Sequence, residues 1–192
     1  KGKPFINLLP LDEGETITTV MKLPECEDDC KDMSIMFATS QGNVRRNSLM
    51  DFVNVQSNGK IAMKLDEGDK LINVRICHED NDIMLAARSG KCIRFPVTDV
   101  RVFVGRNSTG VRGIKLAEGD EVISMSILLH SDATSEERDE YARIASAIKR
   151  ISAERGDDSC VSPEDTGLLN VLTTEKYKEM AEREQFILSV TS

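Results

Sequence analysis

Apolar and polar side chains alternate in three similar stretches of the chain, and each stretch follows an acidic turn that contains a glycine. The turn glycines are 54 and 51 residues apart. Alternation with a period of two directly after a glycine turn predicts a strand with one buried face. The three copies cover residues 11–23, 65–77 and 116–128, with their turns at Gly14, Gly68 and Gly119.

A second pattern, strand–glycine turn–strand, occurs twice and predicts two β-hairpins. The hairpins cover residues 36–46 and 84–94 and start 48 residues apart. Each leads through a connection into a short segment, SNGKIAMK or STGVRGIK, that precedes the next acidic turn. A repeat of about 50 residues with about four short strands is typical of β-propellers. Since residues 1–127 show no long helical pattern, we expect an all-β, propeller-like domain over residues 1–129.

A third copy of the hairpin pattern begins near the end of the sequence. Residues 186–192 match the strand that precedes the turn glycine in each hairpin. If Leu188 is aligned with Met36 and Met84, the third turn glycine falls two residues beyond Ser192. We therefore expect residues 185–192 to form the first strand of a further, truncated blade.

Residues 130–184 interrupt the strand patterns with a segment of helical character. Thr134 and Glu137 have the spacing of a capping box, and apolar side chains follow at helical intervals. This pattern predicts a helix from Ser135 to about Arg155, an acidic, turn-rich and mobile loop over residues 157–166, and a second, shorter helix over residues 174–184. Such an insert should stand on the rim, outside the hydrogen-bonded sheets.

The composition limits the compartment and the kind of partner. Aromatic residues make up only 4% of the 192 residues, and tryptophan is absent, so the core must be aliphatic and base stacking on rings is disfavoured. The sequence has neither an apolar run long enough to span a bilayer nor a signal peptide. It begins at Lys1 without a methionine, which suggests an excised fragment. Five scattered cysteines fit reduced thiols, so we expect a cytoplasmic protein.

Charge is distributed unevenly along this acidic chain, whose formal net charge is −8. Residues 1–127 carry −2 and residues 128–192 carry −6, yet residues 88–115 carry +6 and residues 42–64 carry +3. Positive charge gathered locally on an acidic protein favours an anionic partner, although exposed basic side chains can also serve only to keep the surface of a fold hydrated. Because equivalent positions of a repeat lie on equivalent surfaces, the basic segments should share one edge and the acidic turns another.

Several local patterns do not support catalysis or metal binding. Gly105 and Gly110 have the spacing of a phosphate-binding loop, but Val111 and Arg112 stand where lysine and a hydroxyl residue are required. Cys26 and Cys30 lack a second ligand pair for zinc, so an exposed acidic loop is expected there. Surface positions are expected for the two histidines and a core position for Tyr141. The histidines are His78 and His130.

Four long motifs resemble the C-terminal domains of DNA gyrase A subunits. They are KGKPFINLLPLDEGE, FATSQGNVRR, NGKIAMKLDEGDKLI and NSTGVRGIKLAEGDEVISM, and the resemblance covers residues 1–128 and 186–192. It implies a β-pinwheel, in which four-stranded antiparallel blades exchange a hairpin with the next blade. Residues 130–184 resemble the insert carried by gyrases of alphaproteobacterial type. The basic-glycine box of the family, similar to QRRGGKG, is absent, as are the winged-helix region and the active-site tyrosine.

The resemblance implies non-sequence-specific binding and bending of duplex DNA around a basic outer rim, in support of ATP-dependent negative supercoiling. It also implies the gyrase B subunit as a partner, with ATP and Mg²⁺ belonging to the whole enzyme, and neither a membrane partner nor a metal, cofactor or catalytic residue in this segment. The rival interpretations are a β-propeller scaffold for protein partners and the equivalent domain of the topoisomerase IV A subunit. The predicted phosphate contacts are Arg45, Arg46, Lys60, Lys64, Lys91, Arg94, Arg106, Arg112 and Lys115.

Overall fold

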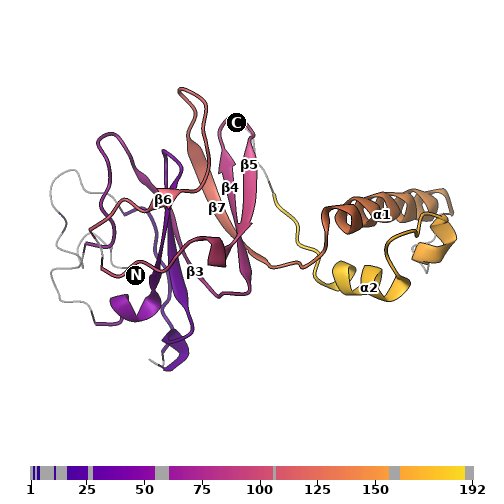
Figure 1. Ribbon diagram of the computed structural model, residues 1–192, viewed down its shortest axis with the longest axis horizontal. Coiled ribbons are helices and arrows are strands. Elements are labelled where there is room, and N and C mark those ends of the chain that lie inside the picture. Colours follow the sequence, from indigo (N-terminus) through magenta and orange to yellow (C-terminus); the bar gives the residue numbers. More distant parts are fainter. Residues whose placement is uncertain are drawn as a thin grey trace. The chain divides into compact units, whose positions relative to one another are not determined.

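The chain divides into two compact units, Lys1–Leu128 (unit 1) and Leu129–Ser192 (unit 2). The computed structural model describes residues 17–25, 28–54, 61–105, 107–155 and 161–188, together with Gly2, Pro4 and Leu11. Unit 1 is built from β-strands and unit 2 from helices, as Figure 1 shows. None of the described helices is long and apolar enough to cross a membrane.

The first sheet of unit 1 has four strands in the order β3-β1-β2-β6. The first predicted hairpin forms strands β1 (Ser34–Thr39) and β2 (Asn43–Ser48), and the second acidic turn leads into β3 (Leu71–Cys77). Gly42 turns the hairpin with φ 85°, a left-handed conformation that favours glycine. All three strand pairs are antiparallel. The acidic-turn strand therefore completes the sheet of the hairpin that precedes it.

The second sheet repeats this plan with three strands in the order β5-β4-β7. The second hairpin forms β4 (Asn81–Ala87) and β5 (Cys92–Pro96), and the third acidic turn leads into β7 (Val122–Leu129). The chain first passes between the sheets from β3 to β4, through residues 78–80.

Strand β6 (Val111–Arg112) belongs to the second repeat but pairs with β2 of the first sheet. Two glycines beside β6 allow this close approach. A Cβ atom on Gly110 would lie 2.2 Å from the carbonyl oxygen of Val44, and a Cβ atom on Gly113 would lie 2.9 Å from a side-chain carbon of Leu85. The exchange of this segment therefore depends on the glycine spacing of the STGVRGIK segment.

The core of unit 1 lies on both faces of the first sheet. Met36 and Ala38 of β1 join a buried cluster with Ile83 and Leu85 of the second sheet. Their neighbours along the strand face the other way, into a second cluster that contains Ile35, Phe37, Leu49 and Val74. Strand β1 is consequently buried over its whole length, and the core is mainly aliphatic, as the composition predicts.

Unit 2 contains helix α1 (Ser135–Arg155), a 3₁₀ turn (Pro163–Thr166) and helix α2 (Thr174–Glu182). The predicted capping box begins α1, because the Glu137 N–H donates to Thr134 Oγ1 at 3.2 Å and the Thr134 N–H donates to Glu137 Oε2 at 2.7 Å. The rings of Tyr141 and Tyr177 stack at 4.9 Å beside the buried Ile144. Tyr141 is thus a core residue, as predicted.

Two local expectations differ from the structure, and a third is described only in part. Residues 17–23 form no strand, whereas in the two later copies the acidic-turn strand pairs with the hairpin that precedes it; residues 12–16 lie outside the described ranges. Residues 185–188 form no strand ladder and residues 189–192 lie outside the described ranges, so the first strand of a further blade over residues 185–192 stays a prediction. The expected loop is ordered over residues 162–167 by a capping box at Ser162; residues 157–160 lie outside the described ranges.

Candidate nucleic-acid interface

Arg45 of β2 is buried, so the prediction that it contacts phosphate from the surface is wrong. Only 1% of the residue is exposed. Its guanidinium donates to Asn47 Oδ1 at 2.9 Å, to the Ser108 carbonyl at 2.6 Å and to the Gly105 carbonyl. Burial lowers the pKa of Arg45 from its ordinary value, and the Asp51 carboxylate opposes that shift. Arg45 therefore anchors the loop of the second repeat to the first sheet.

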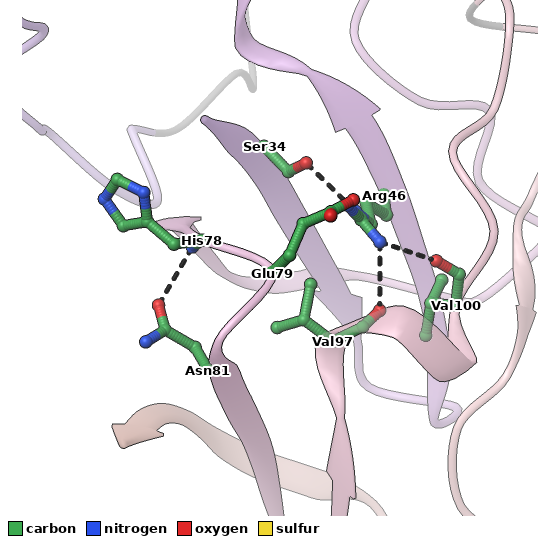
Figure 2. A network of polar contacts seen from close by, with 7 residues as sticks. All are labelled: Ser34, Arg46, His78, Glu79, Asn81, Val97 and Val100. Atoms are coloured by element: carbon green, nitrogen blue, oxygen red, sulfur yellow. Dashed lines mark hydrogen bonds and ion pairs between the residues drawn. The ribbon is translucent and has the colours of Figure 1, made fainter. Parts of the chain in front are cut away.

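Arg46 is also buried, at 4% exposure, and its predicted phosphate contact is wrong for the same reason. Figure 2 shows its guanidinium directed at the chain between β5 and β6. Nε donates to Ser34 Oγ at 2.9 Å, and Nη1 lies 3.4 and 3.5 Å from the carbonyl oxygens of Val97 and Val100. Nη2 forms an ion pair with Glu79 at 2.7 Å. Arg46 therefore fastens the connection of the second repeat to β2.

Arg94 is the repeat equivalent of Arg46, 48 residues later, and it is more exposed. Its side chain is 39% exposed, and Nε lies 2.7 Å from Oδ2 of Asp82, which stands where the first repeat has Ser34. Side chains alternate along a strand, so Arg94 and its neighbour Ile93 face opposite sides of β5. Ile93 stands where the first repeat has the buried Arg45, and it is 37% exposed.

Three of the predicted contacts lie on or beside β5 and β6. Lys91 Nζ donates to the carbonyl oxygen of Lys115 at 2.8 Å. Arg112 and Ile93 line one cavity of about 220 Å³ with residues of β2 and β6, and the acidic Asp99 lines the same cavity. Lys91, Arg112 and Lys115 are all exposed. We call these three residues the β5–β6 cationic surface.

The remaining predicted contacts are one exposed lysine and two residues outside the described ranges. Lys64 is exposed on the segment that precedes the second acidic turn. Lys60 and Arg106 lie outside the described residues. The prediction omitted Arg101, which is exposed and has its guanidinium carbon 4.2 Å from the centre of the Phe103 ring. An arginine two residues before a phenylalanine in a basic stretch was the available sequence signal, since such pairs can stack.

The acidic turns do not lie on a separate edge, contrary to the sequence expectation. Asp69 Oδ1 accepts hydrogen bonds from the Ser40 hydroxyl at 2.8 Å and from the Gln41 N–H at 2.9 Å, within the glycine turn of the first hairpin. Burial of Asp69 opposes ionisation, but these donors outweigh it together with Thr39 and Lys70, so the pKa of that carboxyl is lowered. The acidic turn therefore closes the hairpin turn.

The second repeat shows the same device. Asp120 Oδ2 accepts from the Ser89 hydroxyl at 2.7 Å, and Ser89 provides the largest effect lowering the pKa of Asp120. Lys91 also lowers this pKa, and Arg88 forms an ion pair with Glu121. Acidic and basic side chains are thus interleaved at this end of the second sheet.

Cys30 and part of the glycine loop belong to the fold. Within them, no group of three His, Cys, Asp or Glu side chains could hold a metal ion. Cys30 is buried in the core instead of in an exposed loop, and Cys26 lies outside the described residues. The carbonyl groups of Gly105 and Ser108 point toward Arg45, so that part of the glycine loop serves the fold.

Two repeats of antiparallel strands, joined by a strand that the second repeat lends to the first sheet, define a β-pinwheel, a propeller-like repeat domain. Residues 34–78 and 81–128 each match a family model described as "DNA gyrase C-terminal domain, beta-propeller". The chain belongs to this family of DNA gyrase C-terminal domains. The predicted all-β pinwheel with a helical insert is confirmed.

Curated relatives agree with this assignment. The chain is 51% identical over 191 residues to the DNA gyrase A subunit of Rickettsia bellii, and the match covers 100% of this chain and 21% of the relative. It is 49% identical to the A subunit of Granulibacter bethesdensis gyrase, again over 100% of this chain and 21% of the relative. The Escherichia coli protein of the same name is 40% identical over 66% of this chain and 14% of that protein. The chain thus spans about a fifth of its first relatives.

Solved structures share the fold of unit 1. A DNA gyrase A C-terminal domain superposes with a TM-score of 0.56 at 26% identity, covering 67% of this chain and 41% of the other. The C-terminal domain of a DNA topoisomerase IV superposes with a TM-score of 0.60 at 23% identity, covering 68% and 40%. The similarity to the topoisomerase IV domain, at 23% identity, shows a common fold.

Proposed function

We propose that this chain binds duplex DNA without sequence preference and bends it, as the C-terminal domain of a gyrase A subunit. The observation that carries the proposal is the β5–β6 cationic surface, where Lys91 contacts the backbone of Lys115 and both lysines and Arg112 are exposed on or beside β5 and β6 of an acidic chain. Membership of the gyrase family supports DNA as the anionic partner.

The binding mechanism is electrostatic. Lysine and arginine side chains neutralise phosphates and release condensed counterions, which contributes about 0.9 to the salt slope of the affinity for each contact. The described part of unit 1 contains only strands, loops and short 3₁₀ turns, and no helix that could enter a major groove. Phosphate contacts of this kind position a duplex but carry no sequence information. Bending 20–30 base pairs costs on the order of 1–6 kcal/mol, which several contacts must offset.

In the whole enzyme, the bent duplex would support negative supercoiling driven by ATP. The gyrase B subunit is the expected protein partner, ATP and Mg²⁺ would act at other parts of the enzyme, and the compartment would be the cytoplasm. Arg94, Lys64, Lys60 and Arg106 remain proposed contacts beside the β5–β6 cationic surface, whereas Arg45 and Arg46 act inside the fold.

Fluorescence anisotropy with labelled duplexes of unrelated sequence tests the proposal. The three residues of the β5–β6 cationic surface are changed together to glutamate in K91E/R112E/K115E. The control K22E/K70E/R75E makes the same change of charge at exposed residues outside that surface. Loss of three contacts lowers the salt slope by about 2.7, so the ratio of affinities at 50 and 200 mM salt shrinks by about 40-fold.

The wild-type chain should bind duplexes of unrelated sequence with equal affinity, and this affinity should fall steeply as the salt concentration rises. Affinity that is independent of salt would overturn electrostatic binding. Equal weakening of both triple variants would show that charge acts diffusely and not through the β5–β6 cationic surface.

A further inference from the structure

Charge is polarised along helix α1 of the acidic unit 2. The first turns of the helix contain four acids and one base, and the remainder contains four bases and one acid. The net charge of −6 over residues 128–192 is therefore not spread evenly. The bases in the second part are Arg143, Lys149, Arg150 and Arg155.

Two of these bases border a groove on unit 2. The groove has a volume of about 440 Å³ and is lined by Arg143, Arg150, Ser146, Ala142, Ala147 and Leu168. Arg143, Ser146 and Arg150 are three, four and seven residues apart, so they share one side of α1. The alanines leave the surface between the arginines open to a ligand.

Glu140 fixes the opposite wall of the groove. Its carboxylate accepts the backbone N–H groups of Asn170, Val171 and Leu172 at 2.8, 3.0 and 2.9 Å. The bond from Asn170 is the largest effect lowering the pKa of Glu140. Because residues 170–172 are held in this way, Leu168 is kept at a defined place beside α1, and the groove is formed before any ligand arrives.

The two arginines are available for a ligand. In the part of the chain that the structure describes, Arg143 and Arg150 are both exposed, and Arg143 is near enough to Glu140 to help lower the pKa of that carboxyl. Several acids of unit 2 are engaged elsewhere: Glu137 in the cap of α1 and Glu140 at residues 170–172. Exposed charges farther away than about 8 Å are largely screened at physiological salt.

We infer that this groove binds phosphate groups of duplex DNA, an inference that rests on the proposed function. Arginine presents a planar fork of donors that suits phosphate oxygens, and the Ser146 hydroxyl adds a donor between the two arginines. Seven helical residues separate the arginines by about 10 Å. Each strand of DNA carries one phosphate charge for every nucleotide, so both arginines can contact phosphates of the same backbone. Unit 2 then contributes to DNA binding although its net charge is negative.

The test uses the full chain and charge reversal inside and outside the groove. R143E/R150E removes both arginines of the groove, and R143Q/R150Q removes them without adding acid. R138E/K178E is the matched control, because it makes the same charge change at exposed residues that do not line the groove. Helical circular dichroism and the melting temperature verify that each variant is folded.

Both groove variants should lower the salt slope by about 1.8, so that the ratio of affinities at 50 and 200 mM salt shrinks by about 12-fold, while R138E/K178E keeps the wild-type slope. Groove variants that match the control would overturn the inference. Inorganic phosphate, compared with chloride at equal ionic strength, tests a site for free anions: phosphate binding that needs Arg143 and Arg150, while DNA binding does not depend on them, would overturn the assignment to DNA.

The two proposals fail in different ways. A wild-type chain that does not bind DNA contradicts the proposed function itself. Binding that weakens in K91E/R112E/K115E but not in the groove variants contradicts only the role of the groove.

Discussion

Replacing Arg46 by alanine is expected to destabilise unit 1 by about 3 kcal/mol, because it leaves three buried oxygen atoms without their donor. The change removes the donor to Ser34 at 2.9 Å and leaves the carbonyl groups of Val97 and Val100 without their contacts at 3.4 and 3.5 Å. An unsatisfied buried polar group costs about 1–3 kcal/mol, and the long distances place these two at the lower end. The pair with Glu79 adds little, because the Glu79 side chain is 73% exposed.

Urea unfolding should be monitored by the methyl NMR signals of Ile83 and Leu85, which are buried in unit 1. Fluorescence is unsuitable, because the chain has no tryptophan and both tyrosines, Tyr141 and Tyr177, lie in unit 2. With a denaturant dependence of about 1–3 kcal/mol/M, the expected loss moves the midpoint down by about 1–3 M.

Arg75→Ala is the matched control, because Arg75 is exposed on β3 of the same sheet. Its effect should be within about 0.5 kcal/mol. If R46A and R75A unfolded at the same urea concentration, Arg46 would not hold the second repeat to the first sheet. If R46A also weakened DNA binding without loss of stability, Arg46 would be the surface phosphate contact that the sequence suggested.

Three further outcomes can be measured. Because the pKa of Asp69 is lowered in the folded state, the stabilisation that this carboxylate gives is complete above the ordinary aspartate pKa and is lost as pH falls through the folded value. D69N should therefore destabilise unit 1 at pH 7 and flatten the decline in its stability below about pH 4, as measured by thermal melts at a series of pH values. Gly110→Ala should lower the melting temperature strongly, because φ is 90° and the new Cβ would meet a backbone oxygen at 2.2 Å. Arg101→Ala should weaken DNA binding in anisotropy more than R75A does, since the Phe103 ring holds the Arg101 guanidinium in place; equal effects would refute this.

Local patterns predicted the elements whose partners are close in sequence. The alternation on either side of Gly42 predicted a hairpin, and β1 and β2 form it. The spacing of Thr134 and Glu137 predicted the start of α1 at Ser135. In each case the partner residues lie within a few positions, so the sequence contains the whole interaction.

The burial of Arg45 and Arg46 could not be predicted in this way. Charged side chains on a strand ordinarily indicate a solvent face, and here the compensating acceptors are backbone carbonyls. Arg45 reaches Ser108, which is 63 residues away, and Arg46 reaches Val100, which is 54 residues away. A carbonyl group is present at every residue, so no residue type marks it as a partner.

Strand pairing across the repeat was equally hidden. The repeat pattern included the segment STGVRGIK, but its position on the first sheet depends on the space beside Gly110 and Gly113. The exposed cations were easier to predict, because Lys91, Arg112 and Lys115 lie within the basic stretch of residues 88–115. Their proximity required the approach of β6 to β5, which only the three-dimensional structure shows.

The strand that the second repeat lends to the first also sets an order of assembly. In many repeat proteins, folding can begin in any module and spread to its neighbours. Here the open edge of β2 is covered only after Val111 has been synthesised, since Val44 pairs with Val111. An uncovered strand edge is a template for wrong pairing, so a nascent chain that ends between β3 and β6 is the species most exposed to aggregation. The two repeats should then unfold together in one cooperative step.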